Sequence, residues 1–242
     1  MNEWAERAKT YENISWAKEE TYLKTFLEAT RPKKTDILLD CGTGTARIAA
    51  LFSPFVKKVV ALDISKDMLS VAKTKIQGYK NMHLIKGNIL NIPFPANSFD
   101  KITARMVFHH IKEQKKALDE CHRVLKPKGL FIFSEGIPPH PSVKNFYTAV
   151  SKFLEDRVDY TEEDIYNFLK GNFDNISMYF YTTRLSINNW LSNHALPKNT
   201  QEEIVRMYRD AEENIKKAYD MEEKNGDILV TGKFNITTAV KV

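Results

Sequence analysis

The stretch Ile37–Ala50, with the sequence ILLDCGTGTARIAA, constrains this chain more than any other. Three apolar residues run into an acid, then into Gly42 and Gly44, and then into the small and apolar residues of a helix start. This pattern predicts a buried strand, a tight turn and a helix. Glycines permit positive φ and let a ligand approach the backbone, and the free N–H groups of the helix start point toward it. The turn is a candidate ligand site, with a purely steric role for the glycines as the alternative.

A second apolar run favours the ligand interpretation. Residues Lys57–Ser65 (KKVVALDIS) include Asp63, about twenty residues beyond the turn, where nucleotide-binding βαβ units carry an acid that binds the ribose. A dinucleotide site needs room for a pyrophosphate, yet Asp40 precedes the first glycine and Ala46 takes the place of the third. Because an acid at Asp40 repels a pyrophosphate, the turn suits a cationic amino-acid group better.

At these residues the sequence resembles the class I S-adenosylmethionine-dependent methyltransferases, whose first motif is an acid followed by a Gly-x-Gly turn. Residues 92–111 (IPFPANSFDKITARMVFHHI) resemble the fourth motif region of small-molecule methyltransferases of ubiquinone and menaquinone biosynthesis. Residues 118–136 (LDECHRVLKPKGLFIFSEG) are similar to the helix, the turn (here Lys126–Gly129) and the fifth strand of the same family. The resemblance covers Ile37–Glu135, about two fifths of the chain.

The resemblance implies a fold, a cofactor and a set of contacts. The expected fold is α/β, a doubly wound, mostly parallel, seven-stranded Rossmann-like sheet in a single domain over residues 1–242. The expected cofactor is S-adenosylmethionine, and no metal site is predicted. Asn88 stands where the family usually has an acid for the adenine, and its side-chain oxygen still accepts a hydrogen bond. The predicted cofactor contacts are Tyr11, Asp40, Gly42, Gly44, Asp63, Ile64, Met68, Asn88, Ile89 and Arg105.

Two segments outside the motifs are expected to cover the site. Residues 1–30 have the pattern of a helical cover, in which Tyr11 and Trp16 wall the cofactor or simply pack on the sheet. Residues 186–227 separate a strand at Ser177–Leu185 from a last strand at Ile228–Val240 and form a candidate helical lid. Nine acids against five bases over residues 200–227 suit a small, partly apolar substrate better than a phosphate backbone.

The charge distribution along the chain indicates whether nucleic acid is an expected partner. Residues 1–140 carry 23 basic and 15 acidic side chains, and residues 141–242 carry 13 and 16. The basic excess is scattered lysine without arginine and aromatic interleaving, which favours a solvated surface over a nucleic-acid footprint. An RNA methyltransferase and a non-catalytic S-adenosylmethionine-binding protein are the two alternatives to a small-molecule enzyme. The oligomeric state has no signal in the sequence.

Cysteine use and hydropathy indicate a compartment. Cys41 and Cys121 are the only two cysteines, which argues against a disulfide framework and suits a reducing environment. No run approaches the roughly 18 apolar residues of a membrane span, and the first ten residues are charged where a signal peptide is apolar. A cytoplasmic location is expected.

The chemistry of a sulfonium methyl group limits what the protein must supply. The group is already an activated electrophile, so the enzyme chiefly aligns a nucleophile on O, N or activated C and excludes water. A general base is needed only where the nucleophile loses a proton. The fourth strand is expected to run through Ile102 to Phe108, and His109 and His110 are expected to end it. The candidate bases are these two histidines, His140 and Glu135 near the fifth strand, and His194 in the lid. Of these, His110, His140 and His194 are the predicted catalytic residues. A structural or surface position is the alternative for each histidine.

Asp63→Ala is expected to weaken cofactor binding by about 1.5 to 3 kcal/mol, because the substitution removes charge-assisted hydrogen bonds to the ribose. Isothermal titration calorimetry measures this directly. An unchanged cofactor affinity would show that Asp63 does not bind the ribose.

Overall fold

The computed structural model describes residues 8, 20–154, 156–192, 194 and 196–242. Its strands are β1 (Ile37–Cys41), β2 (Lys58–Asp63), β3 (Met82–Lys86), β4 (Phe99–Arg105), β5 (Leu125–Ser134), β6 (Gly136–Ile137), β7 (Phe173–Ser186), β8 (Glu222–Lys224) and β9 (Asp227–Lys241). Its helices are α2 (Glu20–Thr30), α3 (Arg47–Phe52), α4 (Lys66–Lys75), α5 (Gln114–Val124), α6 (Lys144–Ser151), α7 (Glu162–Leu169), α8 (Ile187–Ser192), α9 (Lys198–Arg209) and α10 (Glu213–Ala218). Three short 3-10 turns are η3 (Ser53–Phe55), η4 (Phe108–His110) and η5 (Pro141–Val143).

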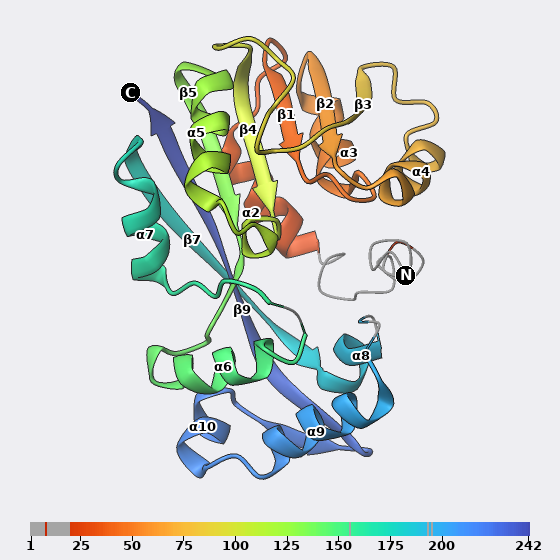
Figure 1. Ribbon diagram of the computed structural model, residues 1–242, viewed down its shortest axis with the longest axis vertical. Helices are drawn as coiled ribbons and strands as arrows, with labels where there is room; N and C mark the ends of the chain where they lie inside the picture. Colours follow the sequence, from red (N-terminus) through yellow and green to blue (C-terminus); the bar gives the residue numbers. More distant parts are fainter. Residues whose placement is uncertain (1–7, 9–19, 155, 193, 195) are drawn as a thin grey trace.

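One sheet organises the described residues (Figure 1). Its order is β3-β2-β1-β4-β5-β9-β6, with β7 and β8 paired to β9. Strands β1 to β5 are parallel, and β9 is antiparallel to β5 and β7. Helices α2, α3 and α4 share one core cluster and α5 and α7 the other, so both faces of the sheet are covered. The doubly wound, mostly parallel sheet is confirmed, and the short strands β6 and β8 bring the expected seven to nine.

The local signals around the glycine turn are confirmed. Residues Ile37–Cys41 form β1, and α3 begins at Arg47 after the turn. Ser65 caps α4 as expected, because its hydroxyl accepts a hydrogen bond from the Met68 amide. Both cysteines are buried and free.

The fourth strand is shorter than expected. We predict from the sequence that it runs to Phe108, but β4 ends at Arg105. Met106 takes a φ of +55°, which breaks the extended backbone, and Phe108–His110 form η4. His109 and His110 therefore lie on a turn rather than at the end of a strand. The expected Lys126–Gly129 turn is also wrong, because these residues are an irregular part of β5.

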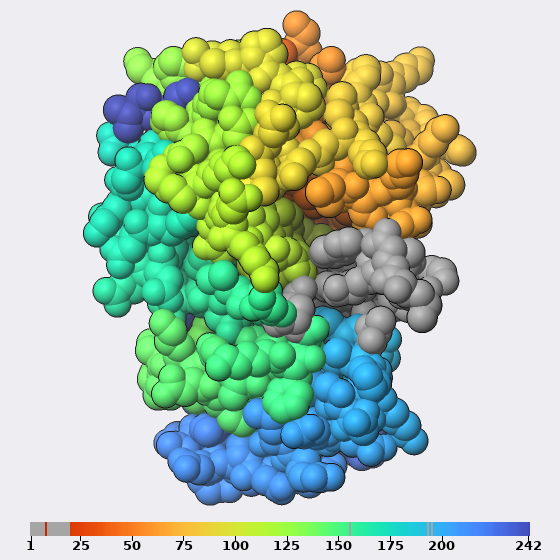
Figure 2. Space-filling model, in the orientation of Figure 1, coloured from red at the N-terminus to blue at the C-terminus, as the bar shows by residue number. Residues whose placement is uncertain are grey.

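Strands β7 and β9 extend beyond the rest of the sheet and carry a second lobe. We call α6 together with α8, α9 and α10 the cap, which lies at the lower end in Figures 1 and 2. Burial along β9 alternates over residues 227–233 and becomes continuous over 234–239. The first part packs one face on the cap, and the second part is covered on both faces. The cap has its own apolar cluster, which includes Val150, Ile204 and Val230.

Asn235 lies where β9 passes from its pairing with β6 to its pairing with β5. Its side-chain oxygen accepts a hydrogen bond from the Glu135 amide at 2.7 Å, and its Nδ2 donates to Thr237 Oγ1 at 2.8 Å. Its backbone carbonyl accepts a hydrogen bond from the Ser134 hydroxyl at 2.6 Å. Because Asn235 is fully buried, these bonds satisfy polar groups that water does not reach.

Tyr11 and Trp16 of the predicted N-terminal cover lie outside the described residues. Helix α2, the described end of that segment, buries Tyr22 and Phe26. Among the helices of the described ranges, none is long and apolar enough to cross a bilayer.

Asn235→Ala is expected to lower the free energy of unfolding by about 2 to 3 kcal/mol, because it leaves the buried Glu135 amide without an acceptor. Urea unfolding measures the loss. Asn145→Ala, at an exposed position of α6, is the matched control and is expected to change stability by less than about 0.5 kcal/mol. Equal effects of the two substitutions would contradict a stabilising role for the buried hydrogen bonds of Asn235.

Candidate active site

The glycine turn after β1 opens a cavity. Gly42 and Gly44 have φ of +63° and +54°. A Cβ on Gly42 would lie 2.4 Å from Val107 Cγ2, so only glycine lets the turn after β4 approach. A Cβ on Gly44 would meet nothing within 4 Å. Gly44 therefore faces open space, as a backbone that receives a ligand must.

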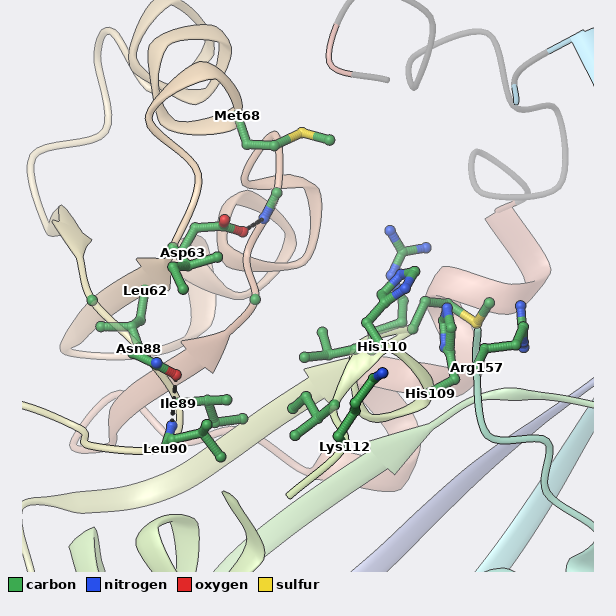
Figure 3. A pocket seen from close by; sticks show the side chains of 18 of the residues that line it. Leu62, Asp63, Met68, Asn88, Ile89, Leu90, His109, His110, Lys112 and Arg157 are labelled. Atoms are coloured by element: carbon green, nitrogen blue, oxygen red, sulfur yellow. Dashed lines mark hydrogen bonds between the residues drawn. The ribbon is translucent and has the colours of Figure 1, made fainter. Parts of the chain in front are cut away.

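This first cavity has a volume of about 430 Å³ and lies at the carboxyl ends of β1, β2, β3 and β4. Asp63, Met68 and Asn88 lie on one side of it, and His109, His110 and Arg157 lie on the other (Figure 3). Parallel sheets collect ligands at this edge. Eight predicted cofactor contacts line the cavity: Gly42, Gly44, Asp63, Ile64, Met68, Asn88, Ile89 and Arg105.

Asp63 connects the end of β2 to the glycine turn. Its Oδ2 accepts a hydrogen bond from the Gly44 amide at 2.7 Å, and its Oδ1 accepts one from the Ser65 amide at 2.8 Å. Burial raises the pKa of Asp63 above its ordinary value, against the lowering effect of these amide donors. A carboxylate has about four acceptor positions, so both oxygens retain capacity for ligand hydroxyls.

Asp40 lies behind the turn rather than on the cavity wall. It is 2% exposed, and its two oxygens accept hydrogen bonds from the Thr43 hydroxyl at 2.6 Å and the Thr103 hydroxyl at 2.7 Å. Burial raises the pKa of Asp40 to about 6, while these hydroxyls and the Arg105 charge lower it. Its observed contacts hold the turn on β4.

The Asn88 side chain forms a hydrogen bond within its own loop. Its Oδ1 accepts a hydrogen bond from the Leu90 amide at 2.9 Å. This bond shapes the loop after β3 and takes one of the two lone pairs of that oxygen. The backbone of this loop, from Gly87 to Leu90, lines the first cavity.

A buried carboxylate holds the turn after β4. Glu135 is completely buried, and its Oε1 accepts hydrogen bonds from the amides of Val107 at 3.1 Å and Phe108 at 2.8 Å. Its Oε2 lies 2.5 Å from Nδ1 of His109. When Glu135 is ionised, a neutral His109 donates through Nδ1–H, which leaves Nε2 as the proton-accepting nitrogen. Sequence reasoning missed this pair, because no pattern links residues 26 positions apart.

The three selected histidines have different positions. His110 lines the first cavity, and its ring centroid lies 3.8 Å from that of His109. His194 also lines it, with Nδ1 placed 2.9 Å from the Trp190 carbonyl oxygen. His140 lies outside both cavities, exposed and bonded to Ser142. The structure therefore brings His109, His110 and His194 to one cavity and leaves His140 on the surface.

A second cavity of about 100 Å³ lies between the sheet and the cap. Met106, Arg157 and Trp190 line both cavities, so the two adjoin. Arg157 is paired with Asp159, with 3.2 Å between Nε and Oδ1. The other walls are mainly apolar and aromatic. Arg157 and Tyr147 carry no sequence signal, whereas Tyr208 and Tyr219 stand among the aromatic residues of the predicted lid.

Metal ligation is a separate question. Within the described ranges, no group of three or more His, Cys, Asp or Glu side chains is placed to hold a metal ion.

Comparisons with known proteins indicate the family of the chain. A family model described as a methyltransferase domain matches residues 39–133. Demethylmenaquinone methyltransferase of Staphylococcus epidermidis is 30% identical over 180 residues, covering 66% of this chain and 75% of the relative. Methyltransferase YcgJ of Bacillus subtilis is 26% identical over 188 residues, covering 75% of this chain and 74% of the relative.

Solved structures show a shared fold. The crystal structure of YcgJ has a TM-score of 0.82 at 22% identity and covers 92% of this chain and 99% of its own. Geranyl diphosphate C-methyltransferase from Streptomyces coelicolor, in complex with Mg²⁺, geranyl diphosphate and S-adenosylhomocysteine, has a TM-score of 0.61 at 12% identity. That match covers 92% of this chain and 79% of the other.

The free energy of unfolding is expected to fall between pH 4.5 and 7 because of Glu135. Burial raises its pKa from 4.5 to about 7, against the lowering effects of Arg157, His110 and the turn amides. The folded state then holds an extra proton in this window, so the contribution is complete below pH 4.5 and is lost as pH rises through 7. The change is about 3 kcal/mol.

Glu135→Gln cannot ionise, so its unfolding free energy is expected to lack this fall. Urea unfolding at pH 5, 6, 7 and 8 compares the variant with the native chain. Glu203→Gln, at an exposed position of α9, is the control and is expected to follow the native curve. A Glu135→Gln curve parallel to the native one would contradict the assignment.

Proposed function

Because the chain belongs to the S-adenosylmethionine-dependent methyltransferases, we propose that it methylates O, N or activated C of a small molecule bound between the sheet and the cap. The observation that carries this proposal is the adjoining pair of cavities, one at the glycine turn and one under the cap. The name of the demethylmenaquinone methyltransferase relative also supports a small acceptor.

The residues of the first cavity fit the cofactor. Gly44 presents open backbone, and Asp63 offers carboxylate oxygens for ribose hydroxyls. Ile64, Met68 and the loop at Asn88 supply an apolar slot of the kind that holds a planar base. Asp40 acts in this proposal as a positioning residue, because it holds the turn through Thr43. Tyr11 keeps its proposed place at the cofactor, although it lies outside the described residues.

The chemistry limits what the remaining residues do. When bound, the cofactor supplies a sulfonium methyl carbon to which the acceptor's electron pair bonds while the carbon–sulfur pair leaves on sulfur. The walls of the second cavity exclude water from that reaction. Where the acceptor atom carries a proton, His109, His110 and His194, which line the first cavity, are the histidines proposed to receive it. His109 has the best-defined orientation, because Glu135 fixes its Nδ1.

The part of the cap within residues 186–227 is the proposed substrate lid. Residues 186–227 form α8, α9, α10 and β8, and they contribute Trp190, Tyr208 and Tyr219 to the second cavity. These side chains give an acceptor pocket of aromatic character. The excess of acidic residues over 200–227 opposes a phosphate backbone on the same surface.

Titration calorimetry with S-adenosylmethionine, S-adenosylhomocysteine and NAD tests the proposal. We expect micromolar binding of both sulfur nucleosides, about −8 kcal/mol, and none of NAD. Methyl-labelled S-adenosylmethionine, incubated with phenols and amines, is then expected to label a small acceptor and release S-adenosylhomocysteine.

Asp67→Ala, in the first turn of α4 and absent from the cavity lining, is the matched control for Asp63→Ala. It is expected to leave cofactor affinity unchanged. Absence of cofactor binding would overturn the proposal. Salt-dependent RNA binding with label transferred to RNA would replace it by an RNA methyltransferase. Tight cofactor binding without any methyl acceptor would indicate a binding protein.

A further inference from the structure

The two adjoining cavities share a cationic residue. Met106, Arg157 and Trp190 line both cavities, and Arg157 is the charged member of this set. Arg157 lies on the loop between α6 and α7. In the first cavity it is on the same side as His109 and across from Asp63 (Figure 3). A ligand that reaches from one cavity into the other must therefore pass this side chain.

The cavity walls present cations, whereas the carboxylate partners of these cations lie behind the walls. Arg157 and Lys112 line the first cavity, and Lys233 lines the second. Each has an ion-pair partner that lines neither cavity: Asp159 at 3.2 Å from Arg157, Asp156 at 2.7 Å from Lys112, and Glu162 at 2.7 Å from Lys233. The surface offered to a ligand near Arg157 is therefore more positive than the charge of the surrounding residues as a whole.

Within the described ranges, two carboxylates line the cavities, Asp63 and Glu113. Asp63 lies across the first cavity from Arg157 and accepts hydrogen bonds from backbone amides (Figure 3). Glu113 is exposed, and its Oε1 lies 3.5 Å from Nζ of Lys116. Neither carboxylate occupies the junction of the two cavities, so an anion can approach Arg157 there.

Arg157 differs from Lys112 in its burial. The side chain of Arg157 is 9% exposed, whereas that of Lys112 is 82% exposed. Water and salt screen the exposed lysine, but they screen a buried charge much less. Asp159 faces Nε of Arg157 and is itself bonded to the Ser151 hydroxyl. The guanidinium is thus held in place before a ligand arrives, which lowers the ordering cost of binding.

The chemistry of the guanidinium group indicates the kind of ligand. Its planar fork has five N–H donors and matches the two oxygens of a carboxylate. A carboxylate partner at Nε is compatible with a second carboxylate on the cavity side. An ammonium group at the same place would be repelled by the fixed positive charge. The mainly apolar wall of the second cavity suits the carbon part of an organic acid.

The carboxylate of the cofactor is the other anion to consider. Arg105, the cation predicted to contact the cofactor, ends β4 next to β1 and its glycine turn. Arg157 comes instead from the loop after α6, and it also lines the second cavity. The two arginines therefore divide the site, with Arg105 toward the cofactor and Arg157 toward the acceptor.

We propose that the methyl acceptor carries a carboxylate group and that Arg157 binds this group at the junction of the two cavities. The acceptor class is then an organic acid rather than a simple amine. This inference rests on the proposed function for the identity of the ligand as the methyl acceptor. Arg157 is in this role a specificity-determining residue, because a neutral or cationic analogue loses the charge-assisted hydrogen bonds.

Fluorine NMR titration of the full chain, saturated with S-adenosylhomocysteine, tests the proposal with three small probes. Fluoroacetate, fluoroacetamide and 2-fluoroethylamine each have two carbons and one fluorine, and at pH 7.5 they are an anion, a neutral molecule and a cation. We expect fluoroacetate to bind the native chain about tenfold more tightly than fluoroacetamide, because only the anion gains the charge-assisted bonds. The amine is expected to bind least tightly.

Substitutions assign the preference to Arg157. Arg157→Gln is expected to remove it. Asp159→Asn keeps the cation and removes a carboxylate that competes with the ligand, so the preference is expected to stay or increase. Arg209→Gln is the matched control, because Arg209 pairs with Glu223 at 3.5 Å and lines neither cavity. It is expected to keep the native preference.

Thermal unfolding shows whether each variant is folded. Arg157→Gln leaves the carboxylate of Asp159 without its cation, whereas the double variant with Asp159→Asn removes both charges and leaves no buried unpaired ion. The double variant is also expected to lose the preference. Equal affinities of fluoroacetate and fluoroacetamide for the native chain would overturn the inference. So would a folded double variant that still prefers fluoroacetate.

Calorimetry with S-adenosylhomocysteine separates the acceptor from the cofactor. Arg157→Gln is expected to change this affinity by less than about twofold, whereas Arg105→Gln is expected to lower it about tenfold. Equal losses in the two variants would assign Arg157 to the cofactor carboxylate and overturn the inference.

The two proposals fail separately. Binding of S-adenosylhomocysteine without a preference for fluoroacetate removes the Arg157 inference and leaves the proposed function. A preference for fluoroacetate that depends on Arg157, in a chain that does not bind S-adenosylhomocysteine, removes the proposed function and leaves a carboxylate site at Arg157.

Discussion

Both cavities depend on the buried carboxylate of Glu135 at the end of β5. One of its oxygens takes the amides of the turn after β4, and the other fixes the ring of His109. Its own backbone amide is bonded to Asn235 of β9, the strand that carries the cap. A single residue thus connects the floor of the first cavity, a candidate proton acceptor and the strand that supports the second cavity. Because the residue is fully buried, each of these bonds must be made within the protein.

The cofactor end of the site is built in a similar way, from carboxylates that bond backbone and hydroxyl donors. Asp63 bonds the amide of Gly44, and Asp40 bonds Thr43 and Thr103. Such contacts fix the backbone of the glycine turn before any ligand arrives, which reduces the ordering cost of binding. The second cavity is different, because its walls are mainly apolar and aromatic and its Arg157 is paired with Asp159. The first cavity therefore offers directed hydrogen-bonding groups, and the second offers mainly apolar surface.

Local sequence signals predicted the elements whose cause is local. The run Ile37–Cys41, the glycine turn and the Ser65 cap follow from hydropathy, backbone freedom and capping. Eight of the residues predicted to contact the cofactor, from Gly42 to Arg105, line the first cavity. The predicted end of the fourth strand at Phe108 was wrong, because Met106 adopts a left-handed φ that hydrophobic periodicity does not reveal. The sequence also indicated His140 as a catalytic residue, although this residue is exposed. The buried pair of Glu135 and His109 was not among the predicted catalytic residues.

The sequence alone determined the class of fold and the family, because strand order and the spacing from the glycine turn to Asp63 are properties of a contiguous stretch. Only the tertiary structure decided which side chains share a site. Glu135 meets His109 from 26 residues away, and the second cavity gathers Tyr147, Tyr208 and Tyr219 from three cap elements. Contacts of this kind depend on how the extended strands β7 and β9 position the cap against the sheet. No periodicity encodes that placement, because it results from the packing of surfaces that are far apart in the chain.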